Sequence, residues 1–220
     1  MPAPPDCQRC PALAANRRCV VNGYGDPRAR VMVVGEAPGR HGADRTGVPF
    51  TGDRSGRRLQ ALLIRAGLSW EEDPAMERPR LRRVFLTNVV RCNPPGNRNP
   101  TPQETANCAP FLREELEAVR PAVVVAVGWF AARWAFAELL GQRPPAGMRA
   151  LHGRRWAWLA AADRRPGVLL CLVHPARVSR QQWQEAEEAL AAVLREQALS
   201  PSISSEGCEA TPAVARAATA

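Results

Sequence analysis

Four short runs of almost uninterrupted apolar residues divide the chain, and each is typical of a buried strand. They cover residues 30–35, 83–90, 121–128 and 167–175, and valine recurs in all of them. A fifth segment, 154–160, alternates apolar and polar residues and predicts an outer strand or a hairpin. Strands that are apolar on both faces favour a mostly parallel sheet that is covered on each side.

Helical periodicity follows most of these runs. It predicts helices over residues 54–66, 102–119, 129–140 and 180–198, with a short helix within 8–16. Thr101, Pro102 and Glu104 form the sequence signature of a capped helix start. The alternation predicts an α/β fold of three layers, with a central, mostly parallel four-stranded sheet flanked by helices.

The chain of 220 residues has one continuous pattern over 1–199, which predicts a single domain with an N-terminal cysteine-bearing segment. Residues 200–220 are small and polar, and we expect a disordered tail there. No run of about 18 apolar residues is present. The N-terminus "MPAPPDCQRC" lacks the features of a signal peptide. We therefore expect a cytoplasmic monomer without a membrane partner.

The formal net charge is +9, and every basic residue is arginine. One interpretation is the bias of a GC-rich coding sequence, because alanine and proline are also abundant. The other is an anionic partner such as nucleic acid. Charge alone leaves both open.

Polar features follow the ends of three predicted strands: the loop "GEAPG" at 35–39, Asn88 and His174. The carboxyl ends of parallel strands share one edge, so these features are expected to converge on one cleft. The loop fits neither phosphate-binding glycine motif, since no Lys-Ser/Thr follows it and the G-x-G-x-x-G spacing is absent. An ordinary glycine turn is the alternative.

Four of the seven cysteines pair by spacing. Cys7 and Cys10 form a C-x-x-C motif, and Cys92 and Cys108 bracket a turn-rich loop. Four thiolates in two groups suit a structural zinc or a [4Fe-4S] cluster. The alternative is that Cys92 and Cys108 are small core residues, and Cys19 is a competing ligand.

Together these segments resemble the iron–sulfur uracil-DNA glycosylases, families 4 and 5 of their superfamily. The matching stretches, in the family's order across residues 7–180, are "CQRC", "VMVVGEAPG", "DRTGVPFTGD", "FLTNVVRCNPPGNRNPTPQETANC" and "HP". The resemblance implies a parallel sheet flanked by helices and a structural [4Fe-4S] cluster on Cys7, Cys10, Cys92 and Cys108. It also implies hydrolysis of the bond between uracil and deoxyribose in base excision repair, without strand cleavage.

The resemblance further implies a role for each cleft residue. Phe50 matches the aromatic residue that stacks on a flipped base. Asn88 matches the amide that reads the O4 and N3–H edge of uracil, although a local backbone bond would also satisfy it. His174 matches the donor to uracil O2, where charge develops as the base leaves. Gly35 and Ala37 belong to the loop assigned to the same pocket.

Two carboxylates are candidates for positioning water or stabilising a cationic sugar. Glu36 lies in "GEAPG", the form usual in family 4, whereas Asp53 lies in "FTGD", the form usual in family 5. Asp53 also fits a helix N-cap. The segment "HPARVSR" matches the loop that enters DNA, which makes Arg177, Val178 and Arg180 candidate DNA contacts.

The chain mixes the two family patterns. The loop "GRHGADRTG" is closer to family 5 and places Ala43 and Asp44 where family 4 carries an acidic run, so other deaminated bases are candidate substrates. Two other functions stay open: a non-catalytic zinc- or cluster-containing protein that binds nucleic acid, and a hydrolase of free nucleotides.

Overall fold

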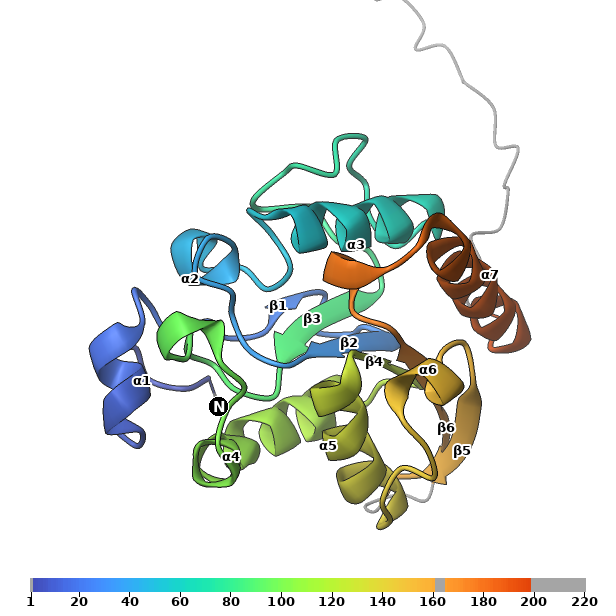
Figure 1. Ribbon diagram of the computed structural model, residues 1–220. Coiled ribbons are helices and arrows are strands. Elements are labelled where there is room, and N and C mark those ends of the chain that lie inside the picture. The colour runs from blue at the N-terminus through green and yellow to red at the C-terminus, as the bar shows by residue number, and fades with distance from the viewer. Residues whose placement is uncertain (1, 161–164, 199–220) are drawn as a thin grey trace, which may run out of the picture.

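A computed structural model describes residues 2–160 and 165–198. Its central sheet has six strands in the order β1-β3-β2-β4-β6-β5 (Figure 1). Four of them pair in parallel: β2 (Val31–Gly35), β3 (Val84–Asn88), β4 (Val123–Val127) and β6 (Pro166–Leu172). The two edge strands pair antiparallel: β1 (Tyr24–Gly25) with β3, and β5 (Arg155–Leu159) with β6.

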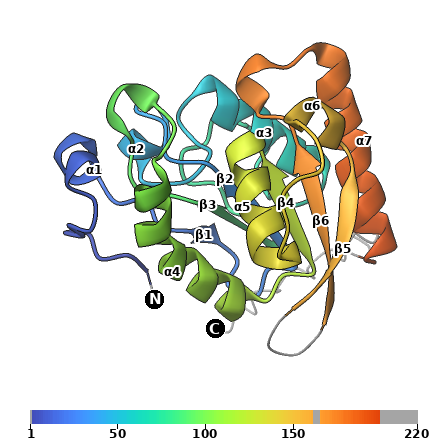
Figure 2. The same cartoon turned by 60° about the horizontal axis from the view of Figure 1, so that its bottom comes forward.

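Helices cover both faces of this sheet (Figures 1 and 2). One face carries α3 (Arg54–Arg65) and α7 (Arg180–Glu196), and the other carries α4 (Pro102–Val119) and α5 (Trp129–Leu140). Shorter elements complete the chain: α1 (Pro11–Asn16), α2 (Ala43–Thr46), α6 (Met148–Leu151) and the 3-10 turns η1 (Pro95–Asn97) and η2 (Pro175–Arg177). Within the described residues, no helix is long and apolar enough to cross a membrane.

Alternate residues of each central strand face opposite layers, as the two-residue repeat of a strand requires. Val31 and Val33 of β2 pack into the core beneath α3 and α7, whereas Met32 and Val34 pack into the core beneath α4 and α5. The same alternation runs through β4. Both faces of the central strands are therefore buried, which explains their continuous apolar sequence.

The three-layer, mostly parallel fold expected from the sequence is confirmed, but the sheet has six strands instead of the expected four, because an antiparallel strand is added at each edge. The four predicted strands are its central strands, and the alternating segment 154–160 contains β5. The two-residue β1 and the short helices α2 and α6 were not predicted. The capping box of α4 is present, with Glu104 N bonded to Thr101 Oγ1 at 3.1 Å and Thr101 N to a Glu104 carboxylate oxygen at 2.8 Å. The tail predicted at 200–220 lies outside the described residues.

Candidate functional site

A large cleft opens at the carboxyl ends of the parallel strands, and its empty space is about 1840 Å³, part of it open to solvent. Six residues predicted from the sequence line it: Glu36, Ala37, Phe50, Asp53, Asn88 and His174. They come from the segments after β2, before α3, at the end of β3 and after β6. Parallel strands thus bring together side chains that are far apart in the sequence, such as Glu36 and His174.

Gly35 ends β2 and lies directly beside Asn88 in the sheet register. A Cβ at this position would lie 2.4 Å from Asn88 Oδ1 and 2.6 Å from Phe50 Cζ. No real Cβ tolerates such contacts. The absence of a side chain at Gly35 therefore allows the Asn88 amide and the Phe50 ring to approach each other.

Phe50 adopts the left-handed backbone conformation, with φ of 56°, which is rare for a bulky residue. Its carbonyl oxygen accepts a bond from Gln60 Nε2 at 3.2 Å, and α3 packs against its backbone at Gly56. The surrounding structure therefore compensates for the strain. Strained residues of this kind cluster at functional sites.

Asn88 is the last residue of β3 and is only 3% exposed. Among residues 2–160 and 165–198, its side-chain amide has no hydrogen-bond partner. Its backbone carbonyl is held by Arg91 Nη1 at 2.9 Å. Its amide atoms are not among the fully buried atoms that lack a hydrogen-bond partner, so they open into the cleft, where a ligand can pair with them.

His174 follows β6 by two residues and precedes η2. Its Nδ1 accepts the Ala176 backbone N–H at 3.2 Å, so the neutral ring carries its proton on Nε2. One side of the residue is exposed in the cleft, and protein packs closely around the rest. This burial lowers the His174 pKa, while the charge of Asp53 opposes the shift. The ring is thus a neutral donor.

Two further contacts hold the His174 segment. Arg58 of α3 donates from Nη1 to the Pro175 carbonyl oxygen at 2.7 Å. Gly128, with φ of +89°, packs against the imidazole, where a Cβ would lie 3.3 Å from His174 Cβ. Two separate parts of the fold, α3 and the residue after β4, therefore set the position of His174.

The two carboxylates in the cleft differ in their surroundings. Asp53 caps α3, because its Oδ1 accepts the Gly56 N–H at 2.7 Å. The sequence-based cap is confirmed, and Asp53 lines the cleft as well. Glu36 has no ion-pair or hydrogen-bond partner for its carboxylate in the described part of the chain. Burial raises the Glu36 pKa.

Arginines surround this cleft. Arg40, Arg54 and Arg98 line it, and Arg98 forms a two-pronged ion pair with Glu104 at 2.7 and 2.8 Å. Val178 directly follows η2 and Arg180 begins α7, beside the His174 segment but outside the cleft lining. Arg177 belongs to η2.

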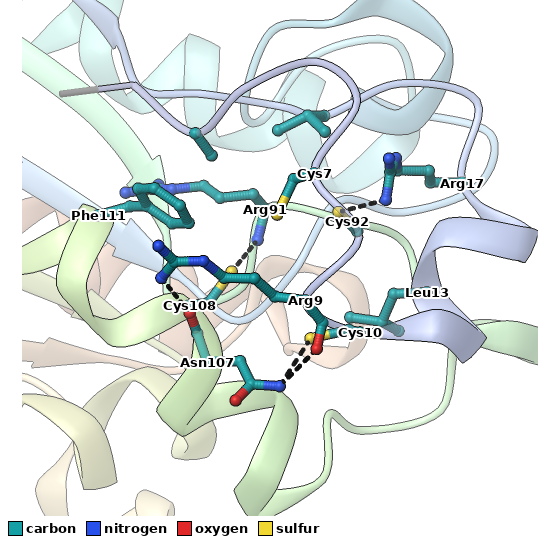
Figure 3. Close-up of a pocket in the computed structure, with 12 residues that line it drawn as sticks. Cys7, Arg9, Cys10, Leu13, Arg17, Arg91, Cys92, Asn107, Cys108 and Phe111 are labelled. Carbon is teal, nitrogen blue, oxygen red and sulfur yellow. Dashed lines mark hydrogen bonds between the residues drawn. The ribbon is translucent and has the colours of Figure 1, made fainter.

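The four paired cysteines line a second pocket, between the N-terminal segment, the loop after β3 and α4 (Figure 3). Cys7, Cys10, Cys92 and Cys108 face a shared space (Figure 3), whose empty volume is about 310 Å³ with part of it open to solvent. In the described residues, no three Cys, His, Asp or Glu side chains lie close enough together to be ligands of one single metal ion. Cys19 and Cys171 do not line this pocket.

Nitrogen donors approach three of the four sulfur atoms (Figure 3). Arg91 N lies 3.4 Å from Cys108 Sγ, Asn107 Nδ2 lies 3.4 Å from Cys10 Sγ, and Arg17 Nη1 lies 3.8 Å from Cys92 Sγ. Burial raises the pKa of Cys92 to about 12 and also raises that of Cys108. Stable thiolates here therefore need a bound cation in addition to these donors.

The comparison with known proteins identifies the family. A family model described as the uracil DNA glycosylase superfamily matches residues 22–197.

This chain belongs to the uracil-DNA glycosylase superfamily.

Curated relatives agree with this assignment. The type-5 uracil-DNA glycosylase of Pyrobaculum aerophilum is 44% identical over 156 residues, which are 62% of this chain and 67% of the relative. The type-4 enzyme of Archaeoglobus fulgidus is 40% identical, over 59% of this chain and 58% of the relative. The type-5 enzyme of Thermus thermophilus is 45% identical, over 50% and 58%. The chain thus matches little more than half the length of the last two.

Sequence reasoning missed several residues that build the cleft of this superfamily member. Asn93, Asn97 and Met148 line the cleft, and the buried Arg91 connects β3 to the cysteine pocket. The Asn-Pro and Gly-Asn pairs within 93–97 are typical of turns. This local pattern does not indicate that the two asparagines contact the loop after β2. The only available signal was their proximity to Cys92.

Proposed function

We propose that this superfamily member is a monofunctional glycosylase that hydrolyses the N-glycosidic bond of uracil in DNA, within base excision repair. One observation carries the proposal: an aromatic ring on a strained backbone, a side-chain amide without a protein partner and a neutral histidine donor line the same cleft. The names of the relatives, type-4 and type-5 uracil-DNA glycosylases, support the same activity.

Recognition begins with extrusion of the nucleotide, because an enzyme cannot reach the glycosidic bond of a stacked base. The Phe50 ring then stacks on the base, a contact worth about 1–3 kcal/mol per base. The Asn88 amide donates to uracil O4 and accepts from N3–H, which supplies partners that the protein itself does not provide. Cytosine presents an amino group at position 4 and would leave this amide mismatched.

His174 acts on the leaving base. As the glycosidic bond breaks, negative charge develops on uracil and is shared with O2. The Nε2–H of His174 donates to O2, and because the ring is neutral, it stabilises the anion without transferring a proton. The bond from Ala176 N to Nδ1 keeps the proton on Nε2.

Glu36 and Asp53 act on the sugar. Departure of the base leaves positive charge on the deoxyribose, and a nearby carboxylate stabilises it or orients the attacking water. Glu36 is the better candidate for contact with water, since one oxygen of Asp53 is engaged in the α3 cap. Gly35 and Ala37 complete the floor of the base pocket, and Arg40 and Arg54 suit contacts with phosphates.

The cysteine pocket fits a [4Fe-4S] cluster held by Cys7, Cys10, Cys92 and Cys108. The fit rests on four thiols around a shared space and on N–H donors aimed at three of them. When bound, the cluster supplies a structural crosslink between the N-terminal segment, the loop after β3 and α4. No step of the hydrolysis is assigned to it. Arg177, Val178 and Arg180 are proposed to contact DNA beside the extruded nucleotide.

The test is excision from labelled single- and double-stranded oligonucleotides that contain one uracil, followed by alkali. We expect alkali-dependent cleavage at uracil by the wild-type protein and none by Asn88→Ala. Parallel oligonucleotides with thymine or hypoxanthine define the range of bases. Cluster-loaded protein that binds uracil DNA without cleaving it would favour the non-catalytic function, and activity on deoxyuridine monophosphate alone would favour a nucleotide hydrolase.

A further inference from the structure

We infer that Asn93 is a positioning residue that fixes the catalytic loop after β2 and connects it to the cysteine-bearing N-terminal segment. The inference rests on the proposed function for its kinetic consequences, but its geometry is independent of it. Asn93 directly follows Cys92 and is 1% exposed. Its side chain contacts three separate segments of the chain.

The first contacts hold the loop. Asn93 Nδ2 donates to the Pro38 carbonyl oxygen at 2.8 Å and to Asn97 Oδ1 at 2.8 Å. Asn97 Oδ1 also accepts the Arg40 backbone N–H at 3.0 Å. The two asparagines therefore hold the peptide groups on both sides of Gly39. We call this pair, Asn93 and Asn97, the asparagine clamp.

Two backbone groups determine the orientation of both amides. The Arg40 N–H can only donate, so an oxygen of Asn97 must face it. The Pro38 carbonyl can only accept, so the nitrogen of Asn93 must face it and the same Asn97 oxygen. The remaining oxygen, Asn93 Oδ1, then accepts from Asn16 Nδ2 at 2.9 Å. These contacts therefore decide, for both amides, which position is the oxygen and which is the nitrogen.

The asparagine clamp also determines the direction in which the Gly39 backbone N–H points. Gly39 O already accepts from Gly42 N and Asp44 N, each at 3.1 Å. In the described residues Gly39 N–H has no partner, and Gly39 lines the cleft. Because a trans peptide points its N–H opposite its C=O, the bond to Pro38 O turns the Gly39 N–H away from Asn93. The donor is thus held in place before substrate binds.

The clamp also joins the two sites. Asn16 ends α1, which begins one residue after Cys10, and its Nδ2 also bonds the Asn93 backbone oxygen at 3.0 Å. Asn93 itself follows Cys92. Two parts of the cysteine pocket therefore connect through Asn93 to the loop that contains Glu36. A change in the cysteine pocket can therefore alter the position of the loop that contains Glu36.

The central variant is Asn93→Asp, which keeps the shape of the side chain and its acceptor to Asn16 but loses both donor bonds. We expect kcat on uracil DNA to fall about 10- to 100-fold, since small misplacements of catalytic groups have effects of this size. KM should change less than about threefold, because the clamp acts on the reacting geometry rather than on DNA affinity. Iron per chain should match the wild type.

A readout that does not need activity accompanies the kinetics. Backbone amides in residues 36–44 should exchange hydrogen for deuterium faster in Asn93→Asp, whereas α4 should be unchanged. This measurement still tests the clamp if the wild-type protein proves not to excise uracil. Unchanged kcat together with unchanged exchange in 36–44 would overturn the inference.

Asn97 provides a second test at an exposed position, in case Asn93→Asp fails to fold or loses its iron. Asn97→Ala removes the acceptor shared by Asn93 and Arg40, whereas Asn97→Asp retains an oxygen there. We expect Asn97→Ala to lower kcat at least about fivefold and Asn97→Asp to recover most of that loss. Equal kcat in Asn97→Ala and wild type would overturn the inference even where Asn93→Asp is uninformative.

Discussion

The side-chain oxygen of Asn88 packs against Gly35 so closely that an added Cβ at Gly35 would lie 2.4 Å from it. The two residues are register partners at the ends of β3 and β2. The Phe50 ring approaches the same point, 2.6 Å from that Cβ position. The base-recognition pair of the proposed enzyme is therefore assembled over a glycine, and its geometry depends on the missing side chain.

Gly35→Ala tests this dependence. Gly35 does not have the positive φ that strains other residues, so the substitution acts through the new methyl group alone. We expect kcat/KM for uracil excision to fall about 10- to 100-fold because the ring and the amide must separate. Overpacking of this kind should also lower stability by about 1–3 kcal/mol, measured by denaturant unfolding.

Gly147→Ala is the matched control, since a Cβ at that position meets no atom within 4 Å. Its kcat/KM should equal that of the wild type. Full activity in Gly35→Ala would show that the Asn88 amide and the Phe50 ring need not approach each other.

Asn88→Asp separates hydrogen bonding from shape. The carboxylate still accepts from uracil N3–H but meets uracil O4 with an oxygen instead of a donor. We expect kcat/KM on uracil to fall about 100-fold or more, because a site built to pair with a polar edge discriminates strongly once the pairing fails. The ratio of uracil to cytosine excision should shrink, measured on oligonucleotides that differ only at that base. An unchanged ratio would remove Asn88 from base recognition.

His174→Ala should lower kcat about 10²- to 10³-fold with a smaller effect on KM, as expected for loss of a donor to a developing anion. Burial lowers the His174 pKa, so the ring stays neutral at pH values below its ordinary range and protonates only under more acidic conditions. The loss of activity that protonation of His174 causes should therefore occur at a pH below the ordinary histidine range. Ring-nitrogen NMR should show a proton on Nε2 alone at neutral pH. A charged ring at pH 7 would contradict the proposed neutral donor.

The periodic parts of the fold could be predicted from the sequence because each carries its own signal. The four apolar runs became the central strands, and the Thr101–Glu104 signature became a capping box. The convergence of Glu36, Asn88 and His174 on one cleft followed from the common direction of parallel strands. These features depend on local sequence and on one general rule of topology.

Other features depend on contacts that no local pattern records. The two-residue β1 exists because it pairs with β3, and two residues are too few to show alternation. Asn93 joins residues 16, 38 and 97, and only the folded chain brings these together. The proton position on His174 follows from one backbone N–H at Ala176. Tertiary contacts, rather than residue type, assign these roles.

Glu36→Gln tests the role of the free carboxylate through pH. Burial raises the Glu36 pKa, so this group takes up its proton at a higher pH than an ordinary glutamate. If the carboxylate stabilises the cationic sugar, kcat should fall as pH drops through that raised pKa and stay constant above it. The Gln variant should have low kcat without this acidic limb. An identical limb in wild type and Glu36→Gln would assign the titration to another group, with Asp53→Asn as the next variant.

The cysteine pocket predicts which thiols are needed for the cluster. Cys92→Ser and Cys108→Ser should each lose most of the iron and the visible absorbance of the protein, because both sulfurs line the shared space. Cys19→Ser is the matched control: Cys19 lies outside that lining, and its Sγ contacts the Asp44 carbonyl at 3.4 Å. Its iron content should equal that of the wild type. A colourless wild-type protein with one tightly bound zinc would exclude the cluster. Full iron content in both Cys92→Ser and Cys108→Ser would show that other residues are the ligands.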